Sequence, residues 1–273
     1  MADDPLTDFE HGTFAPPDGK ERSVFRKGSG PAVIVIAEIP GITPAVADFA
    51  RRVADLGCTA VMPHLFGTPG RDPFAKGKLG MVRYSLSSIG PICVSREFTV
   101  WATGRTSPVI EWLRALARHE HGRCGGPGVG AVGMCLTGGF ALAMAAEPAL
   151  VAPVLSQPSA PLAIRRRQRS SIDCSPEDMA VVKQRCAAEG LEVVGLRFAG
   201  DRLVPPERFE LLRRELGDAF VAVELADESA NPDARTPKPH SVLTEHLIDE
   251  PGEPTREALD LVLDHLRSRL LPA

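Results

Sequence analysis

The chain has 273 residues, enough for one large α/β domain or two small ones with a full hydrophobic core. Its 35 acidic and 31 basic residues nearly cancel, and the net charge of -4 argues against a generic nucleic-acid-binding protein. The N-terminal residues are acidic and lack an apolar core, so no signal peptide is expected, and no apolar run is long enough to span a membrane. The six cysteines are scattered and form no Cys-x-x-Cys pair, which favours a reduced, cytoplasmic protein over a zinc or redox centre.

The N-terminal half begins with an arm and continues into a strand–helix–strand unit. Residues 1–30 are polar and turn-rich, and we expect an arm or edge strands there, followed by one domain over 31–273. Residues 32–37 form a continuous apolar, β-branched run, typical of a strand buried on both faces of a parallel sheet. Thr43-Pro44 then supplies an N-cap and a first-turn proline, Gly57 closes the helix, and the next strand follows at once. A βαβ unit of this length predicts parallel strands.

The remainder of the chain continues the alternation of helices and strands. Residues 67–107 are interrupted by Gly, Ser and Pro and resist assignment, so we expect them to shape a cap or the wall of a pocket. Helices are predicted at 108–118, from Ser175 onward and from Pro254 onward, and strands near 129–133, 151–155, 192–199 and 219–225. This order predicts a single-domain α/β fold with a doubly wound, mostly parallel sheet and helices on both faces.

Residues 129–140, Val-Gly-Ala-Val-Gly-Met-Cys-Leu-Thr-Gly-Gly-Phe, have the strand–turn–helix layout of a nucleophile elbow. Cys135 stands where the serine of Gly-x-Ser-x-Gly would stand, and Gly133 meets the need for a small residue before it. Thr137 replaces the usual second glycine, with Gly138 one step later. The alternative is a buried structural cysteine in a Gly-rich turn, because free cysteine is among the most buried residue types.

A nucleophilic thiol needs a base, and the base needs an orienting acid at the same edge of the sheet. Asp201 follows one predicted strand, and His240 lies in the loop after the next one. The order Cys135, Asp201, His240 is the nucleophile–acid–histidine order of α/β-hydrolases. Asp201 could instead be a simple turn former after glycine, and His246 competes with His240 for the role of base.

Glu38 ends the apolar run of residues 33–37, where a buried carboxylate is costly unless it serves as a partner. A structural glutamate that only caps a helix is the alternative. The loop after such a strand also supplies one oxyanion-hole amide in hydrolases, and the residue after the nucleophile supplies the other. We therefore assign the backbone amides of Ile39 and Leu136 to an oxyanion hole.

Five segments of the chain together resemble the dienelactone hydrolase family, in the family's order and over roughly residues 30 to 270. They are Val-Ile-Val-Ile-Ala-Glu-Ile-Pro-Gly-Ile, Val-Met-Pro-His-Leu-Phe-Gly, Val-Gly-Met-Cys-Leu-Thr-Gly-Gly, Ala-Gly-Asp-Arg-Leu-Val-Pro and Pro-His-Ser. The resemblance implies an α/β-hydrolase with a Cys–His–Asp triad, which carries onto Cys135, His240 and Asp201. It also implies that Glu38 contacts the thiol and sets its ionisation, and that neither a metal nor an organic cofactor takes part.

The arginines depart from what the resemblance implies. Family members that open dienelactones hold the substrate carboxylate with two arginines, one shortly after the catalytic histidine. Residues 241–244 contain none. Arg96 is the candidate for the other contact, with Arg83 and Arg105 weaker, and an ordinary surface arginine is the alternative. The dienelactone itself is therefore in question as a substrate, but hydrolysis is not.

Two further patterns in the chain favour other functions only weakly. Gly128-x-Gly130-x-x-Gly133 matches a dinucleotide fingerprint, but its glycines precede and interrupt the predicted strand, so nucleotide binding is not expected. The basic run at 165–169 could bind an anion or a partner, although a solvated face is the simpler interpretation.

The sequence thus predicts a cytosolic hydrolase of carboxylic esters or lactones that acts through an acyl-thioenzyme. Its expected partner is a small ester or lactone, with a carboxylate on the substrate as one option; nucleic acid and membrane are not expected, and the protein would be a monomer or homodimer. The rival hypothesis is a non-catalytic α/β-hydrolase scaffold with a binding or redox-sensing role, to which Thr137 and the missing arginine lend support.

Overall fold

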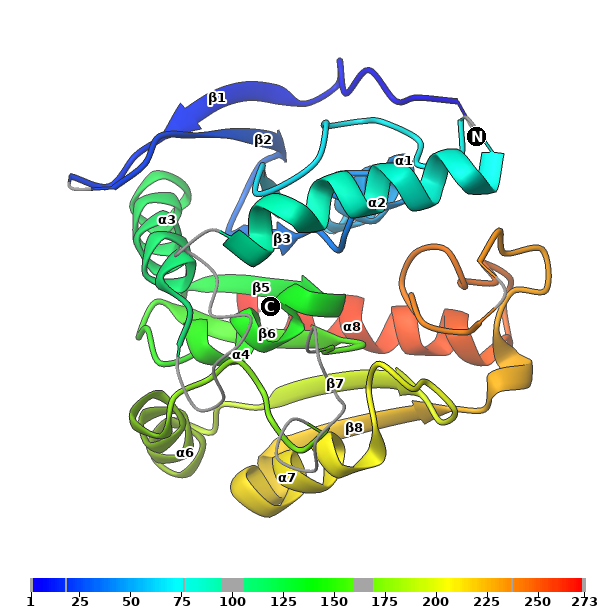
Figure 1. Ribbon diagram of the computed structural model, residues 1–273. Coiled ribbons are helices and arrows are strands. Elements are labelled where there is room, and N and C mark those ends of the chain that lie inside the picture. The colour runs from blue at the N-terminus through cyan, green and yellow to red at the C-terminus, as the bar shows by residue number, and fades with distance from the viewer. Residues whose placement is uncertain are drawn as a thin grey trace.

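An eight-stranded sheet runs through the molecule, with helices on both faces (Figure 1). The computed structural model describes residues 2–17, 19–75, 77–94, 106–159, 169–236 and 238–271, apart from the side chains of 78–79 and 89–94. The strands are β1 (Glu10–Phe14), β2 (Arg22–Gly28), β3 (Ala32–Ile36), β4 (Thr59–Pro63), β5 (Val129–Met134), β6 (Leu150–Ser156), β7 (Val193–Phe198) and β8 (Phe220–Leu225).

The strand order is β1-β2-β4-β3-β5-β6-β7-β8. β1 and β2 pair antiparallel at one edge, β2 also pairs antiparallel with β4, and the remaining neighbours are parallel. The central strands β3, β4 and β5 are buried at every position, as their continuous apolar runs predict for strands covered on both faces. Because these strands are parallel, their carboxyl ends gather at one edge of the sheet.

Seven α-helices are assigned among the described residues, and five of them begin with a proline. Proline suits the first helical turn because its missing N–H would have no partner there, and its fixed φ is already helical. The helices are α1 (Pro44–Asp55), α2 (Gly77–Val94), α3 (Pro108–Cys124), α4 (Gly138–Met144), α6 (Pro176–Glu189), α7 (Pro206–Leu216) and α8 (Pro254–Leu270), with short 3-10 turns η1 (Cys135–Thr137), η2 (Gly217–Ala219) and η3 (Asp227–Ser229).

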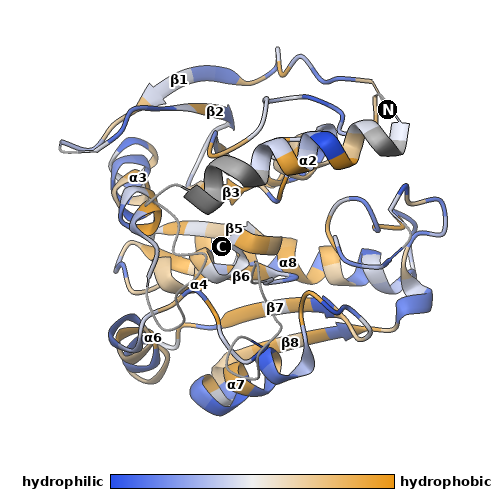
Figure 2. Ribbon diagram, in the orientation of Figure 1, coloured by the Kyte–Doolittle hydropathy of each residue, from blue (hydrophilic) through white to orange (hydrophobic). Residues whose placement is uncertain are grey.

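Two hydrophobic cores lie on the two faces of the sheet. Alternate residues of β3 divide between them: Ile34 and Ile36 join the core under α3, α4, α6 and α7, whereas Val33 and Val35 join the core under α1 and α8. Figure 2 shows the hydrophobic strands β5 to β8 between helices whose outward surfaces are more hydrophilic. This is the doubly wound, single-domain α/β architecture that the alternation of elements predicts.

The structure differs from the sequence-based expectation mainly in residues 67–107. The described part of this segment contains α2, for which the sequence supported no assignment. Gly77, Gly80, Gly90 and Pro91 lie within this helix, and these residue types have the lowest helix propensities, so local preference does not indicate a helix here. The helix expected at 108–118 continues to Cys124, and α7 lacked a sequence-based prediction.

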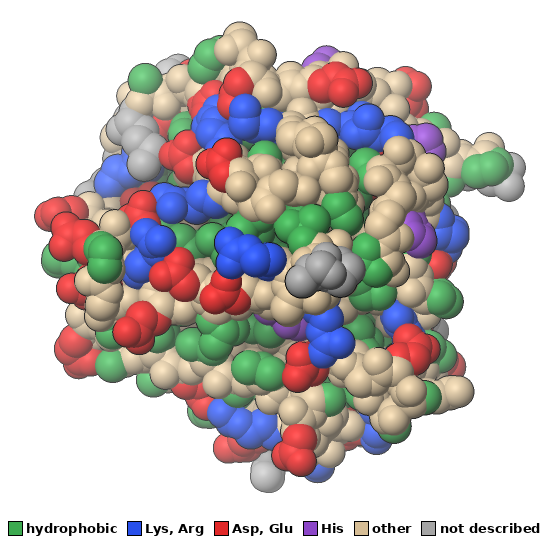
Figure 3. All heavy atoms as spheres, turned by 180° about the vertical axis from the view of Figure 1, so that it is seen from behind, with side chains coloured by type: hydrophobic (Ala, Val, Ile, Leu, Met, Phe, Trp, Pro, Cys, Tyr) green, Lys and Arg blue, Asp and Glu red, His purple; other side chains and the backbone are tan. Residues whose placement is uncertain are grey.

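Within the described residues, no helix combines the length and apolar character needed to cross a membrane. The surface seen in Figure 3 carries acidic and basic side chains interspersed with one another. A single-sign patch of the kind that binds nucleic acid does not dominate this face.

Candidate active site

Cys135 is the first residue of the helical turn η1, directly after β5, and its backbone is strained. Its φ is +56°, a left-handed conformation that is uncommon for residues other than glycine and is associated with functional sites. A Cβ atom added to Gly133 would lie 2.1 Å from the carbonyl oxygen of Thr137. Only glycine fits at position 133, so the local backbone is that of the nucleophile elbow.

Thr137, the departure from the elbow pattern, is fully buried and bonded on two sides. Its hydroxyl accepts a hydrogen bond from the Met134 amide at 2.8 Å and donates one to the Ile36 carbonyl, also at 2.8 Å. The need for a small residue falls on Gly138 instead, where an added Cβ would lie 2.6 Å from the Cα of Pro158. The threonine therefore ties β3 to the elbow and does not disrupt it.

Asp201 and His240 meet at the same edge of the sheet as the elbow. Asp201 follows β7 after two residues, and His240 lies in the long loop after β8. The Nδ1 of His240 is 2.6 Å from Oδ2 of Asp201, and Oδ1 of Asp201 accepts a hydrogen bond from the Leu203 amide at 2.9 Å. The carboxylate thus fixes both the ring and the tautomer of His240, because an Nδ1–H must face it.

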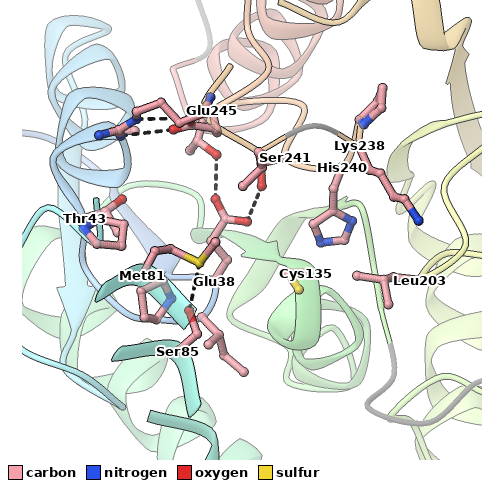
Figure 4. A pocket seen from close by; sticks show the side chains of 18 of the residues that line it. Glu38, Thr43, Met81, Ser85, Cys135, Leu203, Lys238, His240, Ser241 and Glu245 are labelled. Atoms are coloured by element: carbon pink, nitrogen blue, oxygen red, sulfur yellow. Dashed lines mark hydrogen bonds and ion pairs between the residues drawn. The ribbon is translucent and has the colours of Figure 1, made fainter. Parts of the chain in front are cut away.

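The other ring nitrogen of His240 faces the thiol. Nε2 is buried without a hydrogen-bond partner among the described residues, and Figure 4 shows the ring beside Cys135. Burial by itself lowers the pKa of His240, but the charges of Cys135 and Asp201 outweigh it and hold that pKa well above its usual range. The site therefore favours the imidazolium form of His240.

The thiol of Cys135 has a partner that the sequence did not indicate. Its Sγ lies 3.1 Å from Oγ of Ser159, and the Ser159 amide donates to the Cys135 carbonyl at 2.9 Å. Ser159 comes three residues after β6, at the same edge of the sheet as the elbow. Its position beyond a strand end was the only signal available in the sequence, and a serine after proline is too common to single out.

Arg208 is a second residue near the site that sequence reasoning missed. It is 1% exposed, and its guanidinium donates to the carbonyls of Pro158 and Leu203, at 2.8 and 2.9 Å. It thereby joins the segment leading to Ser159 with the turn that follows Asp201. Burial lowers the pKa of Arg208 to about 10, so it remains a cation at neutral pH and contributes positive charge near the thiol and Asp201.

Glu38 is buried at the end of β3, but its hydrogen bonds do not include the thiol contact that the family resemblance implies. Its Oε2 accepts from the Ser241 hydroxyl at 2.7 Å and from the Gln157 amide at 3.3 Å, and its Oε1 accepts from the Thr244 hydroxyl at 2.6 Å. Figure 4 shows the carboxylate directed toward Ser241, away from Cys135. Glu38 thus anchors the loop that carries His240.

The helix-cap alternative for Glu38 also fails, because Thr43 caps α1: its hydroxyl accepts from the Val46 amide at 3.3 Å. Gln157 is a further residue that the sequence did not indicate. It is fully buried at φ +35°, and its Oε1 accepts from the Val242 amide at 3.2 Å. The polar groups around Glu38 are therefore bonded to one another, as buried polar groups require.

Ile39 and Leu136, whose amides were assigned to an oxyanion hole, flank the thiol in the fold. Ile39 follows Glu38 and lines the same pocket as Cys135. Leu136 follows Cys135 within the helical turn and is buried. Both residues occupy turns at the carboxyl ends of neighbouring strands, β3 and β5, where hydrolases place these donors.

A cavity of about 680 Å³ lies next to the thiol (Figure 4), and the surface that lines it is mainly apolar. Its volume is within the size range of small-molecule sites. Ile39, Phe74, Met81 and Leu203 contribute apolar surface, and α2 supplies one side of the wall. The cavity thus lies where ligands of parallel sheets bind, beyond the carboxyl ends of the strands.

Charged groups at the cavity are distributed unevenly. Arg235 is neutralised, because it pairs with Asp72 at 2.8 Å and with Glu245 at 3.2 Å. Arg202 and Lys238 also line the cavity, are exposed, and form no ion pair with the described residues. These two side chains place positive charge near Asp201 and His240, in a cavity that the carboxylates of Glu38 and Asp227 also line.

The structure places the other sequence candidates away from the site or does not describe them. Arg96 and Arg105 lie outside the described residues, as does most of the basic run 165–169, of which Arg169 pairs with Glu207 at 2.7 Å. Arg83 is exposed on α2 and does not line the cavity.

Of the three glycines in the nucleotide-like pattern, Gly128 directly precedes β5, and Gly130 and Gly133 lie within it. β5 begins at Val129, so Gly130 and Gly133 lie within the strand and not in a phosphate-binding loop. A Cβ added to Gly130 would lie 2.9 Å from a methyl carbon of Leu266 on α8. This glycine serves close packing between strand and helix.

The strand order, the strained Cys135 and the Asp201–His240 pair define an α/β-hydrolase. The model of the dienelactone hydrolase family matches residues 22–161, just over half of the chain. This chain therefore belongs to the dienelactone hydrolase family, and it is a hydrolase of the ester class.

Solved structures share the fold at low sequence identity. Similar structures include DcsB in complex with its substrate analogue (13% identity, TM-score 0.59), dienelactone hydrolase from Anabaena variabilis ATCC 29413 (12%, 0.57) and a dienelactone hydrolase-like promiscuous phosphotriesterase from metagenomic libraries (15%, 0.54). Each similarity covers 96% of this chain and 99% of the other. No match was found among the curated proteins.

Proposed function

We propose that this protein hydrolyses carboxylic esters or lactones through a covalent acyl-thioenzyme on Cys135, with His240 as the base and Asp201 as its orienting acid. One observation carries the proposal. The Nε2 of His240 is buried without a partner among the described residues and faces the thiol, while Nδ1 is held by Asp201 at 2.6 Å. A histidine with one nitrogen fixed and the other available next to a strained cysteine is arranged for proton transfer.

The reaction proceeds in two displacement steps. His240 takes the proton of Cys135, and the thiolate attacks the carbonyl carbon of the ester. The negative charge on the carbonyl oxygen is stabilised by the amides of Ile39 and Leu136. The C–O bond of the ester then breaks, and the leaving alkoxide takes the proton from His240. A water molecule, deprotonated by His240, attacks the thioester and releases the acid, which returns the thiol.

The hydrogen bond between Cys135 and Ser159 defines the resting position of the thiol in this proposal. In the resting state the sulfur is bonded to Ser159, 3.1 Å away, and the ring nitrogen of His240 has no partner among the described residues. Rotation about the Cα–Cβ bond of Cys135 would exchange one partner for the other. The raised pKa of His240 favours the imidazolium that this exchange produces.

The substrate in this proposal is a small ester or lactone whose acyl part contacts apolar side chains. The cavity volume of about 680 Å³ and the apolar wall support that choice. Arg202 and Lys238 at its rim support a substrate that carries a carboxylate, and Arg96 stays a candidate for the same role. We place the reaction in the cytosol without a cofactor, by a monomer or homodimer, and the five described cysteines are free, which suits a reducing compartment.

The rival hypothesis of a non-catalytic scaffold rested partly on Thr137. The buried hydroxyl of Thr137 accounts for that residue without a loss of the elbow, because it bonds to both strands that meet there. Nε2 of His240 lies beside the thiol and has no hydrogen-bond partner among the described residues. The rival hypothesis gives no reason for this arrangement.

The test is hydrolysis of a panel of aryl esters and lactones by the wild type and Cys135→Ala. Loss of a covalent nucleophile commonly lowers the rate by about 10⁴- to 10⁶-fold. Iodoacetamide should inactivate the wild type, and a competitive inhibitor should slow the inactivation. Cys186→Ala is the matched control, because that cysteine lies on α6 and does not line the cavity. An intact Cys135→Ala protein that keeps a large share of the activity would end the triad hypothesis.

A further inference from the structure

His240 lies in a loop that has little regular structure to hold it. The described residues of segment 230–253 form turns but neither a helix nor a strand. Asp201 fixes the ring of His240 by one hydrogen bond, but it does not fix the backbone to which that ring is attached. Since a displacement of about 1 Å at a catalytic group can cost about 10²-fold in rate, other contacts must hold this backbone.

His246, which belongs to the same loop, bonds directly to the backbone of residue 240, whereas Glu38 and Gln157 hold residues 241, 242 and 244. Its side chain is 2% exposed, and its Nδ1 accepts hydrogen bonds from the backbone amides of His240, at 3.4 Å, and Ser241, at 3.2 Å. Its Nε2 lies 3.2 Å from the carbonyl oxygen of Thr236. Backbone amides can only donate, so Nδ1 presents its lone pair to them and Nε2 carries the proton. The carbonyl and hydroxyl oxygens of Thr236 both lie 3.2 Å from Nε2.

The ring of His246 thus joins the two sides of the catalytic histidine. It binds residue 236 on one side and residues 240 and 241 on the other. Phe198, at the end of β7, packs edge-on against it, with the ring centres 6.0 Å apart. Because β7 leads directly to Asp201, the contact sets the loop of His240 against the strand that positions its acid.

We propose that His246, as the neutral Nε2–H tautomer, is a positioning residue that holds the backbone of His240 so that its ring can exchange a proton with Cys135. His246 does not line the cavity, so it acts through His240 and not on the substrate. The inference rests on the function proposed above for the triad.

Protonation of His246 would oppose this role. A second proton would occupy Nδ1, where it would face the two backbone N–H groups that now donate to it. Burial is the main cause that lowers the pKa of His246, and the positive charge of His240 adds to it. The Thr236 carbonyl and the nearby carboxylates Glu245 and Glu38 act in the opposite direction. The neutral form therefore prevails at neutral pH and is lost only in acid.

The experiment compares His246→Leu with His246→Asn. Leucine removes both nitrogens, whereas the Oδ1 of asparagine is an acceptor near the position of Nδ1 that cannot ionise. With an activated aryl ester, we expect His246→Leu to lower kcat about 100-fold while KM changes less than about threefold. His246→Asn should stay within about tenfold of the wild type. At acidic pH, the decline of kcat for His246→Asn should depend on one proton fewer than the decline for the wild type.

A second readout needs no substrate. The rate of Cys135 alkylation by iodoacetamide, followed from pH 5 to 10, reports the apparent pKa of the thiol. We expect His246→Leu to raise this pKa, because a displaced His240 stabilises the thiolate less. His265→Asn, at a buried histidine on α8 outside the cavity, is the matched control and should leave both readouts unchanged.

The outcomes separate the two proposals. If His246→Leu lowers Tm but keeps the wild-type kcat and alkylation profile, the positioning role is overturned. If His246→Leu does not fold, His246→Asn decides, because an unchanged number of protons in its acid limb refutes the role. If the wild type hydrolyses no ester yet the alkylation pKa shifts as expected, the proposed function fails and the positioning of His240 stands.

Discussion

Replacement of Asp201 by asparagine tests the triad with little change in shape. The carboxylate accepts one hydrogen bond at each oxygen, from His240 Nδ1 at 2.6 Å and from the Leu203 amide at 2.9 Å. A carboxamide has only one acceptor oxygen. If the new NH₂ group faces the Leu203 amide, that bond is lost. If it faces Nδ1, the bond remains only when Nδ1 gives up its proton and accepts.

Two effects of this substitution lower the rate. The imidazolium of His240 loses a buried charged partner, and hydrogen bonds to charged groups contribute about 1.5 to 3 kcal/mol each. An NH₂ group that faces Nδ1 also favours the tautomer with the proton on Nε2, which cannot take the proton of Cys135. In serine triads the same substitution lowers kcat about 10⁴-fold. A thiol is far easier to deprotonate than a serine hydroxyl. We therefore expect a loss of about 10²- to 10³-fold, or about 3 to 4 kcal/mol.

The assay is kcat/KM for an activated aryl ester between pH 5 and 10. Asp227→Asn is the matched control, because Asp227 lines the same cavity and accepts from the Gly200 amide at 2.8 Å, which asparagine can still do. The control should stay within about threefold of the wild type. If Asp201→Asn keeps more than a tenth of the activity with an unchanged Tm, Asp201 is a turn former and the triad assignment is wrong.

Three further substitutions test the surroundings of the site and the stability of the fold. Glu38→Gln should lower the apparent pKa of Cys135 in iodoacetamide alkylation, because a nearby negative charge that disfavours the thiolate is removed; an unchanged profile would leave Glu38 with a purely structural role. Arg96→Ala should selectively lower kcat/KM for a carboxylate-bearing ester, by about 10- to 150-fold relative to its neutral amide counterpart, as expected for one Arg–carboxylate contact; equal effects on both substrates would exclude Arg96 as the clamp. Burial lowers the pKa of His265 to about 4, whereas the pKa of a histidine in the unfolded chain is near 6.5. As the pH falls, the unfolded chain therefore binds a proton at His265 before the folded protein does. The folded protein loses stability as the pH falls between these two pKa values. Between pH 8 and pH 4, the free energy of unfolding of His265→Leu should therefore rise by about 3 kcal/mol relative to that of the wild type, as measured by urea unfolding at both pH values. A difference between the two proteins that does not depend on pH would contradict the lowered pKa of His265.

The local elements of this protein follow from short stretches of its sequence. Proline at the first turn of five helices and unbroken apolar runs in β3, β4 and β5 have direct physical causes in backbone geometry and burial. The nucleophile elbow is also local, because the clash that excludes a side chain at Gly133 arises from residue 137, four positions away. Cys135, Asp201 and His240 follow β5, β7 and β8, and a parallel sheet brings the carboxyl ends of these strands to one edge.

The partners of the site residues were decided only by the tertiary structure. Glu38 bonds to Ser241 and Thr244, which lie 203 and 206 residues away in the chain, and the resemblance had directed it to the thiol. The sequence likewise did not indicate that Ser159 contacts the thiol, or that His246, a candidate for the base, accepts a hydrogen bond from the backbone amide of His240. Local patterns determine which segments form strands and helices, since these depend on neighbours within a few residues. Which side chains then meet depends on strand register and on the course of loops without regular structure, which only the packing of the whole chain fixes.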